Sequence, residues 1–537
     1  MFTSTLFALF FLVSVTLALP TPTSRRFSAR KNDDTLGERG TVEGTVGLGD
    51  LSDLLYTVPI QLGNTATLVN LDTGSSDLWV VSTDCTENVC AKGRGTSRVP
   101  ADTLKKSGAS VVMRYGDSKT GTYASGPVAA DTISVAGVAI DDQLFAAIDE
   151  TTNPVVEYGV AGILGLGFPA ESQIQYAAVK AEFGKEADVE HFVASSFSDG
   201  PLISRIAQSG ALQNPMFSVA LQRSTIDVSG PGALTLGTLP EGVDNSSLTW
   251  VPVRLYSPAD GGHVAPSFAP NEVYPLRWEI DLEGVFLDGV ELAPSAIPAT
   301  GGVDSARMSA LIDTGNSILR GPKDVVSDIL KTMSPDFYDP EQPNSALVDC
   351  AKFHNLAFKI GGKMFPIDPR DLPTPVAHNN ASACVLNRID STDAPGVGAL
   401  FRWNLGDPFF KSNIVAFHFG NLTHPSQDPP RIGFVSRVPD NAAEELEEAV
   451  DEAVENGGNF ESVPVLSPAD ADVKPKVTVV PTAASQQAAE LTGTLRSTPQ
   501  ATSVLSDKKA KTNGALTRTW NPLLAALAVV ALCTATV

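Results

Sequence analysis

Positively charged residues are scarce in this sequence. Its 537 residues include 38 Lys and Arg against 61 Asp and Glu, which gives a formal net charge of −23. Recognition of nucleic acid requires a basic patch, so this balance argues against a nucleic-acid partner. The acidic excess is typical both of an ordinary secreted protein and of one that remains soluble in acidic surroundings.

Histidine is also rare, and the six that occur include no His-Glu-x-x-His segment. The sequence likewise lacks a phosphate-binding P-loop, a dinucleotide fingerprint and a Gly-x-Ser-x-Gly elbow. These absences leave zinc-peptidase, nucleotide-dependent and serine-hydrolase chemistry without support. The sequence therefore predicts neither a metal site nor a cofactor.

Cysteine is limited to five residues, as expected for an oxidising compartment in which most cysteines are paired. Four of them lie in the body of the chain and one, Cys533, lies near its end; the four are Cys85, Cys90, Cys350 and Cys384. Four cysteines allow three pairings. Glycosylation sequons, which indicate a secreted surface, begin at Asn245, Asn380 and Asn421.

The two longest hydrophobic runs lie at the two ends of the chain, and even these are short. Leu6 to Leu17 have the length of a signal-peptide core, with cleavage predicted after Ala18. The last run, Leu523 to Val537, falls short of the roughly 20 residues that span a bilayer. Small residues beginning at Asn513 precede it, which is the layout of a GPI-anchor signal over residues 514–537 with attachment at Asn513. A tail-anchored segment and simple secretion are the alternatives.

Between these ends the composition changes three times. Residues 19–50 are polar and contain basic pairs, as in a short pro-segment. Short apolar runs separated by turn residues then predict two β-rich domains, 51–240 and 241–437. The predicted strands include 56–62, 110–115, 233–236, 358–360 and 413–419, with one short helix that begins at about 202 and ends near Gly210.

Residues 438–513 begin with an acidic segment and continue as a Ser/Thr/Pro-rich stretch. Apolar residues at helical spacing in 441–456 would suit an amphipathic helix, but the high charge favours a solvated linker. The stretch from 457 onwards predicts a glycosylated stalk, because its composition cannot bury enough apolar surface to fold.

One short pattern occurs twice. NLDTGSSDLWVV spans residues 70–81 and ALIDTGNSILRG spans 310–321, so each copy leads from apolar residues into Asp-Thr-Gly. A single copy would be no more than a strand ending in a turn. Two copies provide a pair of carboxylates, Asp72 and Asp313. Two carboxylates held about 3 Å apart share one proton, so that one can act as a base on water while the other donates a hydrogen bond to a carbonyl.

These residues resemble the catalytic loops of the pepsin-like aspartic proteases of fungal type, over about Leu54 to Arg437. The resemblance implies a mostly β, bilobal fold, a cleft between two related lobes, and a monomer that cleaves peptides or proteins. Asp72 and Asp313 would then be the catalytic pair. The supporting residues would be Thr73, Gly74, Ser75, Thr314, Gly315 and Asn316.

The resemblance extends to a substrate-covering flap and to the cysteines. Tyr115, Gly116 and Asp117 resemble the flap tip, and Trp79 resembles the residue that hydrogen-bonds the flap Tyr. It implies disulfides between Cys85 and Cys90 and between Cys350 and Cys384. It also implies an acidic pH optimum and an apolar preference before the scissile bond, with Lys accepted through Asp117.

The sequence departs from the family pattern in four respects. Asn316 stands where the family has Thr or Ser, although its amide can still donate to the carboxylate. Asn404 stands where the segment behind the second loop is normally aliphatic. Residues 171–200 and 257–275 are longer than the minimal pattern, and the pro-segment is short for a zymogen. An inactive pepsin-fold protein that binds a peptide or glycan at the surface is the alternative function. Glycoside hydrolysis fits less well, because it needs carboxyl groups about 5–9.5 Å apart.

Overall fold

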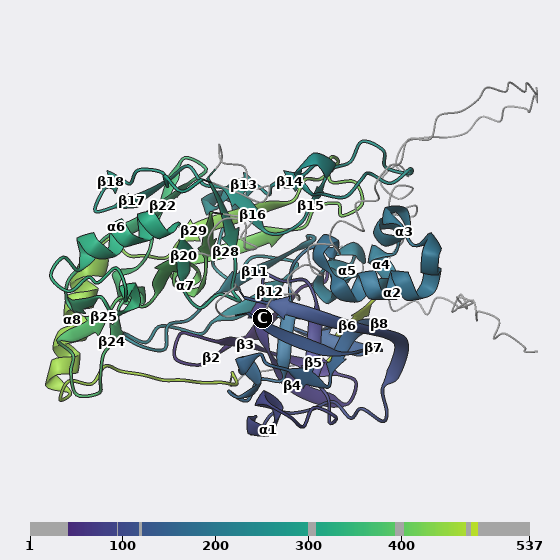
Figure 1. Ribbon diagram of the computed structural model, residues 1–537, viewed down its shortest axis with the longest axis horizontal. Helices are drawn as coiled ribbons and strands as arrows, with labels where there is room; N and C mark the ends of the chain where they lie inside the picture. Colours follow the sequence, from purple (N-terminus) through teal and green to yellow (C-terminus); the bar gives the residue numbers. More distant parts are fainter. Residues whose placement is uncertain are drawn as a thin grey trace, which may run out of the picture. The chain divides into compact units, whose positions relative to one another are not determined.

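Strands dominate this computed structural model, which describes residues 41–93, 95–116, 121–298, 308–391, 402–468 and 474–481 (Figure 1). The predicted signal peptide, Asp117, Asn513 and the apolar tail lie outside the described residues. The mostly β prediction is confirmed, and the strands predicted at 56–62 and 233–236 have those bounds. The predicted short helix is also present, as α5 (Leu202–Gln208).

The N-terminal half forms one large sheet. Its strands, in spatial order, are β2 (Gly49–Asp50), β3 (Tyr56–Leu62), β4 (Thr65–Asp72), β10 (Gly162–Gly165), β5 (Leu78–Val81), β8 (Val138–Ile148), β7 (Thr122–Val135) and β6 (Lys105–Tyr115). Two short strands pair beside this path, β9 (Glu150–Thr151) with β7 and β30 (Val477–Val479) with β8. β4 is an inner strand of this order, with β3 and β10 on its two sides, so the residue that ends it, Asp72, lies inside the sheet and not at its edge.

A second sheet joins the two halves. Its strand order is β1 (Gly44–Gly47), β12 (Ala233–Leu236), β11 (Met216–Ala220), β28 (Asn413–His418), β29 (Arg431–Ser436) and β13 (Thr249–Pro252). The join between the halves is the antiparallel pair of β11 and β28, in which Phe217 is opposite Phe417. The hydrogen-bonded backbone therefore continues from one half of the chain into the other.

The C-terminal half contains smaller sheets. One carries β16 (Glu279–Asp281), β19 (Ser309–Ile312), β27 (Trp403–Leu405), β20 (Leu319–Gly321) and β26 (Ile389–Ser391). The others are β18 (Val290–Glu291), β17 (Gly284–Leu287), β22 (Leu356–Ile360) and β23 (Lys363–Pro366); β21 (Leu347–Asp349), β25 (Ala383–Val385) and β24 (Thr374–Pro375); and the pair β14 (Leu255–Tyr256) and β15 (Tyr274–Pro275). β4 ends at the Asp of the first Asp-Thr-Gly segment, and β19 ends directly before the Asp of the second.

Helices are short and lie between strands. The α-helices are α1 (Val89–Lys92), α2 (Gln173–Phe183), α3 (Val189–Ala194), α4 (Ser196–Asp199), α5, α6 (Lys323–Met333), α7 (Asp407–Ser412) and α8 (Ala442–Glu455). The 3-10 turns are η1 (Pro154–Val156), η2 (Pro169–Glu171), η3 (Gly184–Glu186), η4 (Asn245–Ser247), η5 (Pro258–Asp260), η6 (Pro343–Ser345) and η7 (Pro369–Asp371). The long segment 171–200 is thus mainly helical. Ser172 accepts from the N–H of Gln175 and caps α2.

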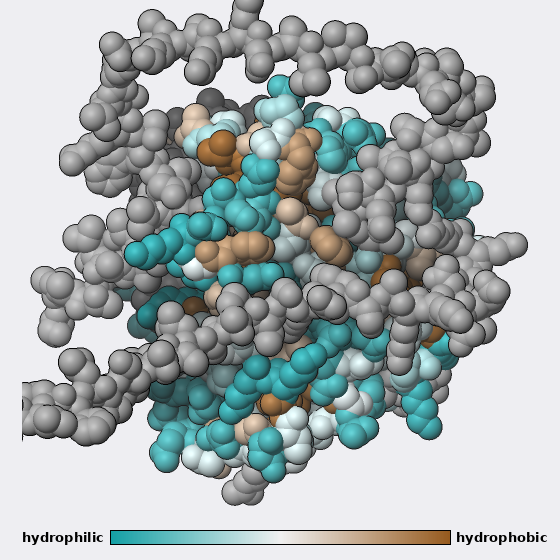
Figure 2. Space-filling view, turned by 90° about the vertical axis from the view of Figure 1, so that its right-hand side faces the viewer, coloured by the Kyte–Doolittle hydropathy of each residue, from teal (hydrophilic) through white to brown (hydrophobic). Residues whose placement is uncertain are grey.

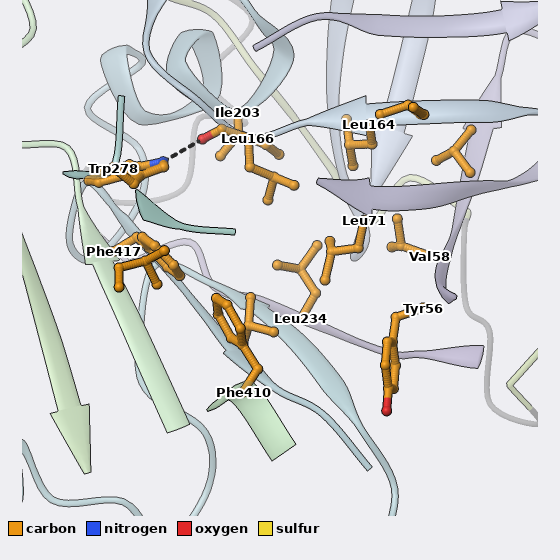
Figure 3. Close-up of a cluster of buried hydrophobic side chains, with 14 of the residues drawn as sticks. Tyr56, Val58, Leu71, Leu164, Leu166, Ile203, Leu234, Trp278, Phe410 and Phe417 are labelled. Atoms are coloured by element: carbon orange, nitrogen blue, oxygen red, sulfur yellow. Dashed lines mark hydrogen bonds between the residues drawn. The ribbon is translucent and has the colours of Figure 1, made fainter. Parts of the chain in front are cut away.

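The core continues from one half of the chain into the other, and Trp278 is one of the buried side chains that connect them (Figure 3). Its ring contacts those of Phe168, Phe417 and Phe419 at centroid distances of 4.1, 5.0 and 5.0 Å. Its indole N–H donates to Leu166 O at 3.0 Å. Burial of each large apolar side chain stabilises the fold by roughly 1.5–3 kcal/mol. On the face drawn in Figure 2, by contrast, hydrophilic side chains predominate and apolar ones form small separate patches.

The acidic segment 441–456 is not the solvated linker that its charge favoured. It forms α8, whose apolar residues Leu446 and Val450 are buried against Ile226 and the Cys350–Cys384 disulfide. The acidic residues occupy the other positions of the helix, so charge and burial coexist on opposite faces.

The globular region also extends beyond α8. Val465 exchanges backbone hydrogen bonds with Asp50, and β30 adds a parallel strand to β8. The first part of the predicted stalk therefore packs on the body, whereas residues 482–513 lie outside the described residues.

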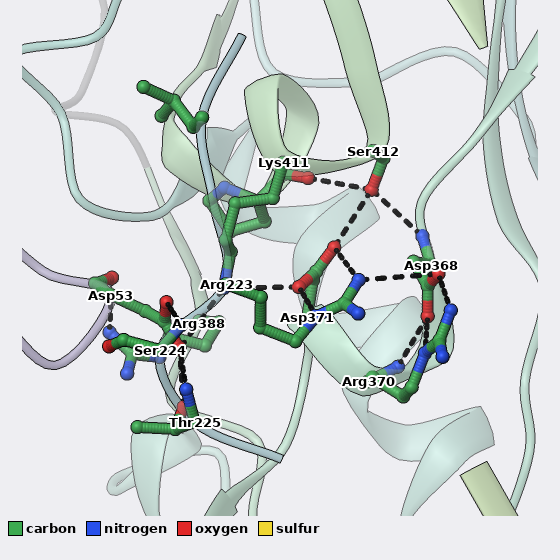
Figure 4. Close-up of polar contacts among 12 residues, drawn as sticks. Asp53, Arg223, Ser224, Thr225, Asp368, Arg370, Asp371, Arg388, Lys411 and Ser412 are labelled. Atoms are coloured by element: carbon green, nitrogen blue, oxygen red, sulfur yellow. Dashed lines mark hydrogen bonds and ion pairs between the residues drawn. The ribbon is translucent and has the colours of Figure 1, made fainter. Parts of the chain in front are cut away.

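Buried charges connect the two halves of the chain (Figure 4). The carboxylate of Asp371 accepts two hydrogen bonds from Arg223, at 2.7 and 3.1 Å, and forms an ion pair with Lys411 at 3.1 Å. Lys411 also lies 3.6 Å from Asp53 in the N-terminal half. Burial by itself would raise the pKa of Asp371, but Arg223 and Lys411 hold it well below its usual range. Asp371 therefore remains ionised in acid.

We expect Asp371→Asn to lower the free energy of unfolding by about 3–5 kcal/mol, because it removes the nearest counter-charge of both Arg223 and Lys411 at a buried site. Denaturant unfolding at pH 6 measures the change, and the exposed Asp102→Asn is the matched control. The folded pKa of Asp371 is depressed, so its contribution is present above about pH 4 and is lost as the pH falls through the folded value. Equal stability of the two variants at pH 6 would contradict a stabilising role for the ion pairs of Asp371 with Arg223 and Lys411.

Candidate active site

Each Asp-Thr-Gly segment leaves a strand that is paired in parallel with the strand behind it. Gly165 at the end of β10 pairs with Asp72 at the end of β4. In the second half β27 pairs with β19, and the N–H of Asp313 donates to Leu405 O at 3.1 Å. The two loops thus have equivalent supports, as expected if the repeated motif marks two related lobes.

Two threonines tie the loops together. Thr73 N–H donates to Thr314 Oγ1, and Thr314 N–H donates to Thr73 Oγ1, both at 3.0 Å. Each threonine hydroxyl in turn donates to a backbone carbonyl of the other half, Thr73 to Ile312 O at 2.7 Å and Thr314 to Leu71 O at 3.0 Å. The four bonds form a symmetric set among buried groups, so neither loop can shift without leaving buried polar groups unpaired.

The glycines allow the carboxyl groups to meet. A Cβ on Gly74 would lie 2.3 Å from Asp313 Oδ1, and one on Gly315 would lie 2.3 Å from Asp72 Oδ1. Each glycine N–H also donates to the Oδ1 of its own loop's aspartate, at 2.9 Å in both cases. No larger residue fits at either position while the two carboxyl groups remain in place.

The site favours retention of a proton. Burial raises the pKa of Asp72 to about 7, with repulsion by Asp313 adding to the effect, whereas the Ser75 hydroxyl lowers it. Burial also raises the pKa of Asp313, and hydrogen bonds from Asn404 and Gly315 lower it. The two groups interact strongly, so they bind and release protons as a pair.

The outer oxygens of the two carboxyl groups, Oδ2 of Asp72 and Oδ2 of Asp313, accept hydrogen bonds from different residues. Ser75 Oγ donates to Asp72 Oδ2 at 2.5 Å, the contact that the resemblance implies. The expected donation from Asn316 to Asp313 is not made. Asn316 Nδ2 donates instead to Ile318 O at 2.6 Å and to Asn404 Oδ1 at 2.9 Å. Asn404 Nδ2 then donates to Asp313 Oδ2 at 2.7 Å.

Asn404 and Asp77 are site residues that sequence reasoning missed. The unusual polar residue at 404 was a signal, but nothing local connected it to Asp313, which is 91 residues away. Asp77 accepts from the N–H groups of Gln173, at 2.7 Å, and Ile174, at 3.3 Å, so it anchors α2 to the first loop. Burial raises the pKa of Asp77 to about 6.

The predicted flap is the hairpin of β6 and β7, in which Tyr115 pairs with Thr122. Gly116 follows with a φ of +77°, a conformation that favours glycine at this turn. The rings of Tyr115 and Trp79 are 6.4 Å apart, but the expected hydrogen bond between them is not made. Tyr115 Oη donates to Met113 Sδ, and Trp79 Nε1 is buried without a partner in the described part of the chain.

Both predicted disulfides are confirmed, with Cα–Cα distances of 5.7 Å for Cys85–Cys90 and 5.0 Å for Cys350–Cys384. Among the sequons, Asn245 is exposed, whereas Asn380 and Asn421 are half-buried. None of the helices in the described ranges is long and apolar enough to cross a bilayer.

Two β lobes that join paired Asp-Thr-Gly loops define the class of pepsin-like aspartic hydrolases. The sequence matches the eukaryotic aspartyl protease family over residues 55–424, and the chain belongs to that family. It is therefore an aspartic-type protease, a hydrolase.

The known proteins that this chain resembles include aspartic proteases, in agreement with the family match. An aspartic protease of Phaffia rhodozyma is 24% identical over 392 residues, covering 72% of this chain and 77% of its own. Cathepsin E of Mus musculus is 26% identical over 375 residues, covering 69% and 79%. The crystal structure of an aspartic proteinase from Irpex lacteus has a TM-score of 0.51 at 18% identity, covering 74% and 97%, which supports the fold.

We expect Thr314→Val to destabilise the protein and to reduce its proteolytic activity. The valine removes the acceptor of Thr73 N–H and the donor of Leu71 O, and each unsatisfied buried group costs about 1–3 kcal/mol. Thr314→Ser retains the hydroxyl and is the matched control. Thermal unfolding and peptide cleavage measure the two effects. A Val variant that behaves like the Ser variant would show that the hydroxyl bonds are dispensable.

Proposed function

We propose that this protein is an acid endopeptidase in which Asp72 and Asp313 activate a water molecule between them. The observation that carries the proposal is the reciprocal Thr73–Thr314 hydrogen bonding, which brings two buried carboxyl groups into contact. An exposed aspartate is about half ionised near pH 4, but this pair holds a proton well above that pH.

The shared proton allows both halves of the reaction. The ionised carboxylate removes a proton from water as the water oxygen attacks the peptide carbonyl carbon, while the protonated carboxyl group donates to the carbonyl oxygen. Collapse of the resulting tetrahedral diol breaks the C–N bond, and the amine leaves with a proton from the dyad. The products are a carboxylic acid and an amine. The chemistry requires no nucleophilic side chain.

Substrate selection is assigned to the flap. Tyr115 and Gly116 end the β6–β7 hairpin, and Tyr115 is half-buried beside Trp79. In this proposal Tyr115 closes over the peptide, which is apolar before the scissile bond. Asp117 next to Gly116 supplies the negative charge that admits Lys at the same position.

Digestion of a mixed peptide library tests the catalytic pair. We expect cleavage that a pepstatin-type ligand blocks and that Asp72→Asn and Asp313→Asn each abolish. Because the pKa of Asp72 is raised to about 7, activity should be lost as the pH rises through about 7, where the shared proton leaves. Activity at lower pH is limited by protonation of the second carboxyl group.

The cleaved bonds test the flap assignment in the same digest. Asp117→Thr should reduce cleavage after Lys more than cleavage after apolar residues. If the folded wild-type protein cleaves nothing after removal of its pro-segment, the peptide-binding alternative replaces the enzyme. Activity that survives in Asp72→Asn would exclude the proposed mechanism.

We also propose that residues 1–18 direct the chain into the secretory pathway and that a GPI anchor at Asn513 retains it at the cell surface as a monomer. The composition of the two ends supports this, together with the sequons. Treatment of intact cells with a phosphatidylinositol-specific phospholipase should release the protein. Protein found only in the medium without treatment would indicate simple secretion.

A further inference from the structure

The two lobes differ at one buried position behind the loops. Ile163 of β10 pairs with Asn70, two residues before Asp72. Asn404 of β27 pairs with Leu311, two residues before Asp313, so Asn404 is the equivalent of Ile163. Both side chains are buried. The second lobe thus places an amide where the first places an aliphatic group.

This amide has a defined orientation. Its Oδ1 accepts from Asn316 Nδ2 at 2.9 Å, and its Nδ2 donates to Asp313 Oδ2 at 2.7 Å. An amide oxygen only accepts and an amide nitrogen only donates, so the bond from Asn316 turns the N–H₂ of Asn404 towards the carboxyl group. Asn316 is itself held by its donation to Ile318 O at 2.6 Å.

In the first loop a single residue supplies the hydrogen bond to the corresponding carboxyl oxygen. Ser75, three residues after Asp72, donates to Asp72 Oδ2 at 2.5 Å. Asn316 is three residues after Asp313 but makes no such bond, because its amide is directed at Ile318 and Asn404. Each outer oxygen therefore has one side-chain donor, from within the loop in the first lobe and from the strand behind it in the second.

We propose that Asn404, held by Asn316, is the positioning residue of the Asp313 carboxyl group and replaces the hydroxyl that the second loop lacks. This inference rests on the proposed function, because it assigns a role within the same catalytic pair. Asn316 and Asn404 form one unit: the first fixes the orientation of the second, and the second contacts the carboxyl group.

The replacement changes the protonation chemistry of the pair. A serine hydroxyl can either donate or accept, so it tolerates a carboxyl oxygen with or without a proton. The Asn404 amide nitrogen can only donate, which opposes a proton on Asp313 Oδ2 and leaves the shared proton to the other oxygens of the pair. In agreement, the Asn404 bond lowers the pKa of Asp313 against the raising effect of burial. Asp72 and Asp407 also interact electrostatically with Asp313, and both remain in the variants below.

Three variants of the secreted chain test this role. Asn404→Ile installs the residue found at the equivalent position of the first lobe, and Asn316→Ala removes the amide that orients Asn404 and bonds Ile318 O, while Asn404 itself remains. The double variant, Asn316→Thr with Asn404→Ile, converts the second loop to the arrangement of the first. The readouts are kcat and KM for one peptide between pH 2 and pH 7, with thermal unfolding as the check on folding.

We expect Asn404→Ile to lower kcat by about 10–100-fold, the effect of losing a hydrogen bond to a charged group, with little change in KM. Since the lost donor favoured ionised Asp313, the acid limb of the pH profile should move to higher pH by about one unit. Asn316→Ala should shift the limb in the same direction by a smaller amount. The double variant should recover most of the kcat, because the threonine hydroxyl introduced in the second loop can donate as Ser75 does.

A folded Asn404→Ile protein with the wild-type pH profile would overturn the inference, as would a double variant no more active than Asn404→Ile alone. If Asn404→Ile does not fold, Asn316→Ala decides, and an unmoved acid limb in that variant counts against the role. Failure of the proposed function looks different, because the wild-type protein would then show no pepstatin-sensitive cleavage at any pH.

Discussion

The reciprocal hydrogen bonds between Thr73 and Thr314 are the constraint on which the rest of the site depends. Two carboxyl groups repel each other once both ionise, and nothing in either lobe alone would bring Asp72 and Asp313 together. The threonine bonds are made by buried groups whose alternative is to remain unpaired, so they oppose separation of the loops. The two glycines then remove the side chains that would otherwise occupy the contact.

The protein contains buried acids whose pKa is lowered and buried acids whose pKa is raised, and the charge of the neighbouring groups determines which occurs. Asp371 faces Arg223 and Lys411 and remains ionised. Asp50 lies beside another acid, Asp53, and burial followed by repulsion from Asp53 raises its pKa to about 8. An acidic medium suits both kinds, because the first retains its charge there and the second retains its proton. The proton held between Asp72 and Asp313 belongs to the same pattern.

Related lobes need not be identical to support one reaction. The threonine, glycine and strand contacts follow the pseudo-symmetry of the two loops, whereas the donors to the outer oxygens do not. The first set of contacts follows from the repeated Asp-Thr-Gly motif. The second set shows that a carboxyl group needs a donor at a given place rather than a given residue, because a hydrogen bond depends on geometry and not on the element that supplies it.

The sequence by itself determined the repeated Asp-Thr-Gly motif, strands such as β3 and β12, the short helix α5 and the class of fold. These are local features, since strand and turn preferences act over a few residues. It did not determine which side chain donates to Asp313, whether the Trp79 N–H has a partner, or whether residues 441–456 form a packed helix. The apolar residues of 441–456 have helical spacing, but the high charge of this segment favoured a solvated linker. In the folded chain Ile226 and the Cys350–Cys384 disulfide form the surface against which those apolar residues are buried. Only tertiary structure decided these points, because each depends on a partner that lies far away in the sequence and close in the folded chain.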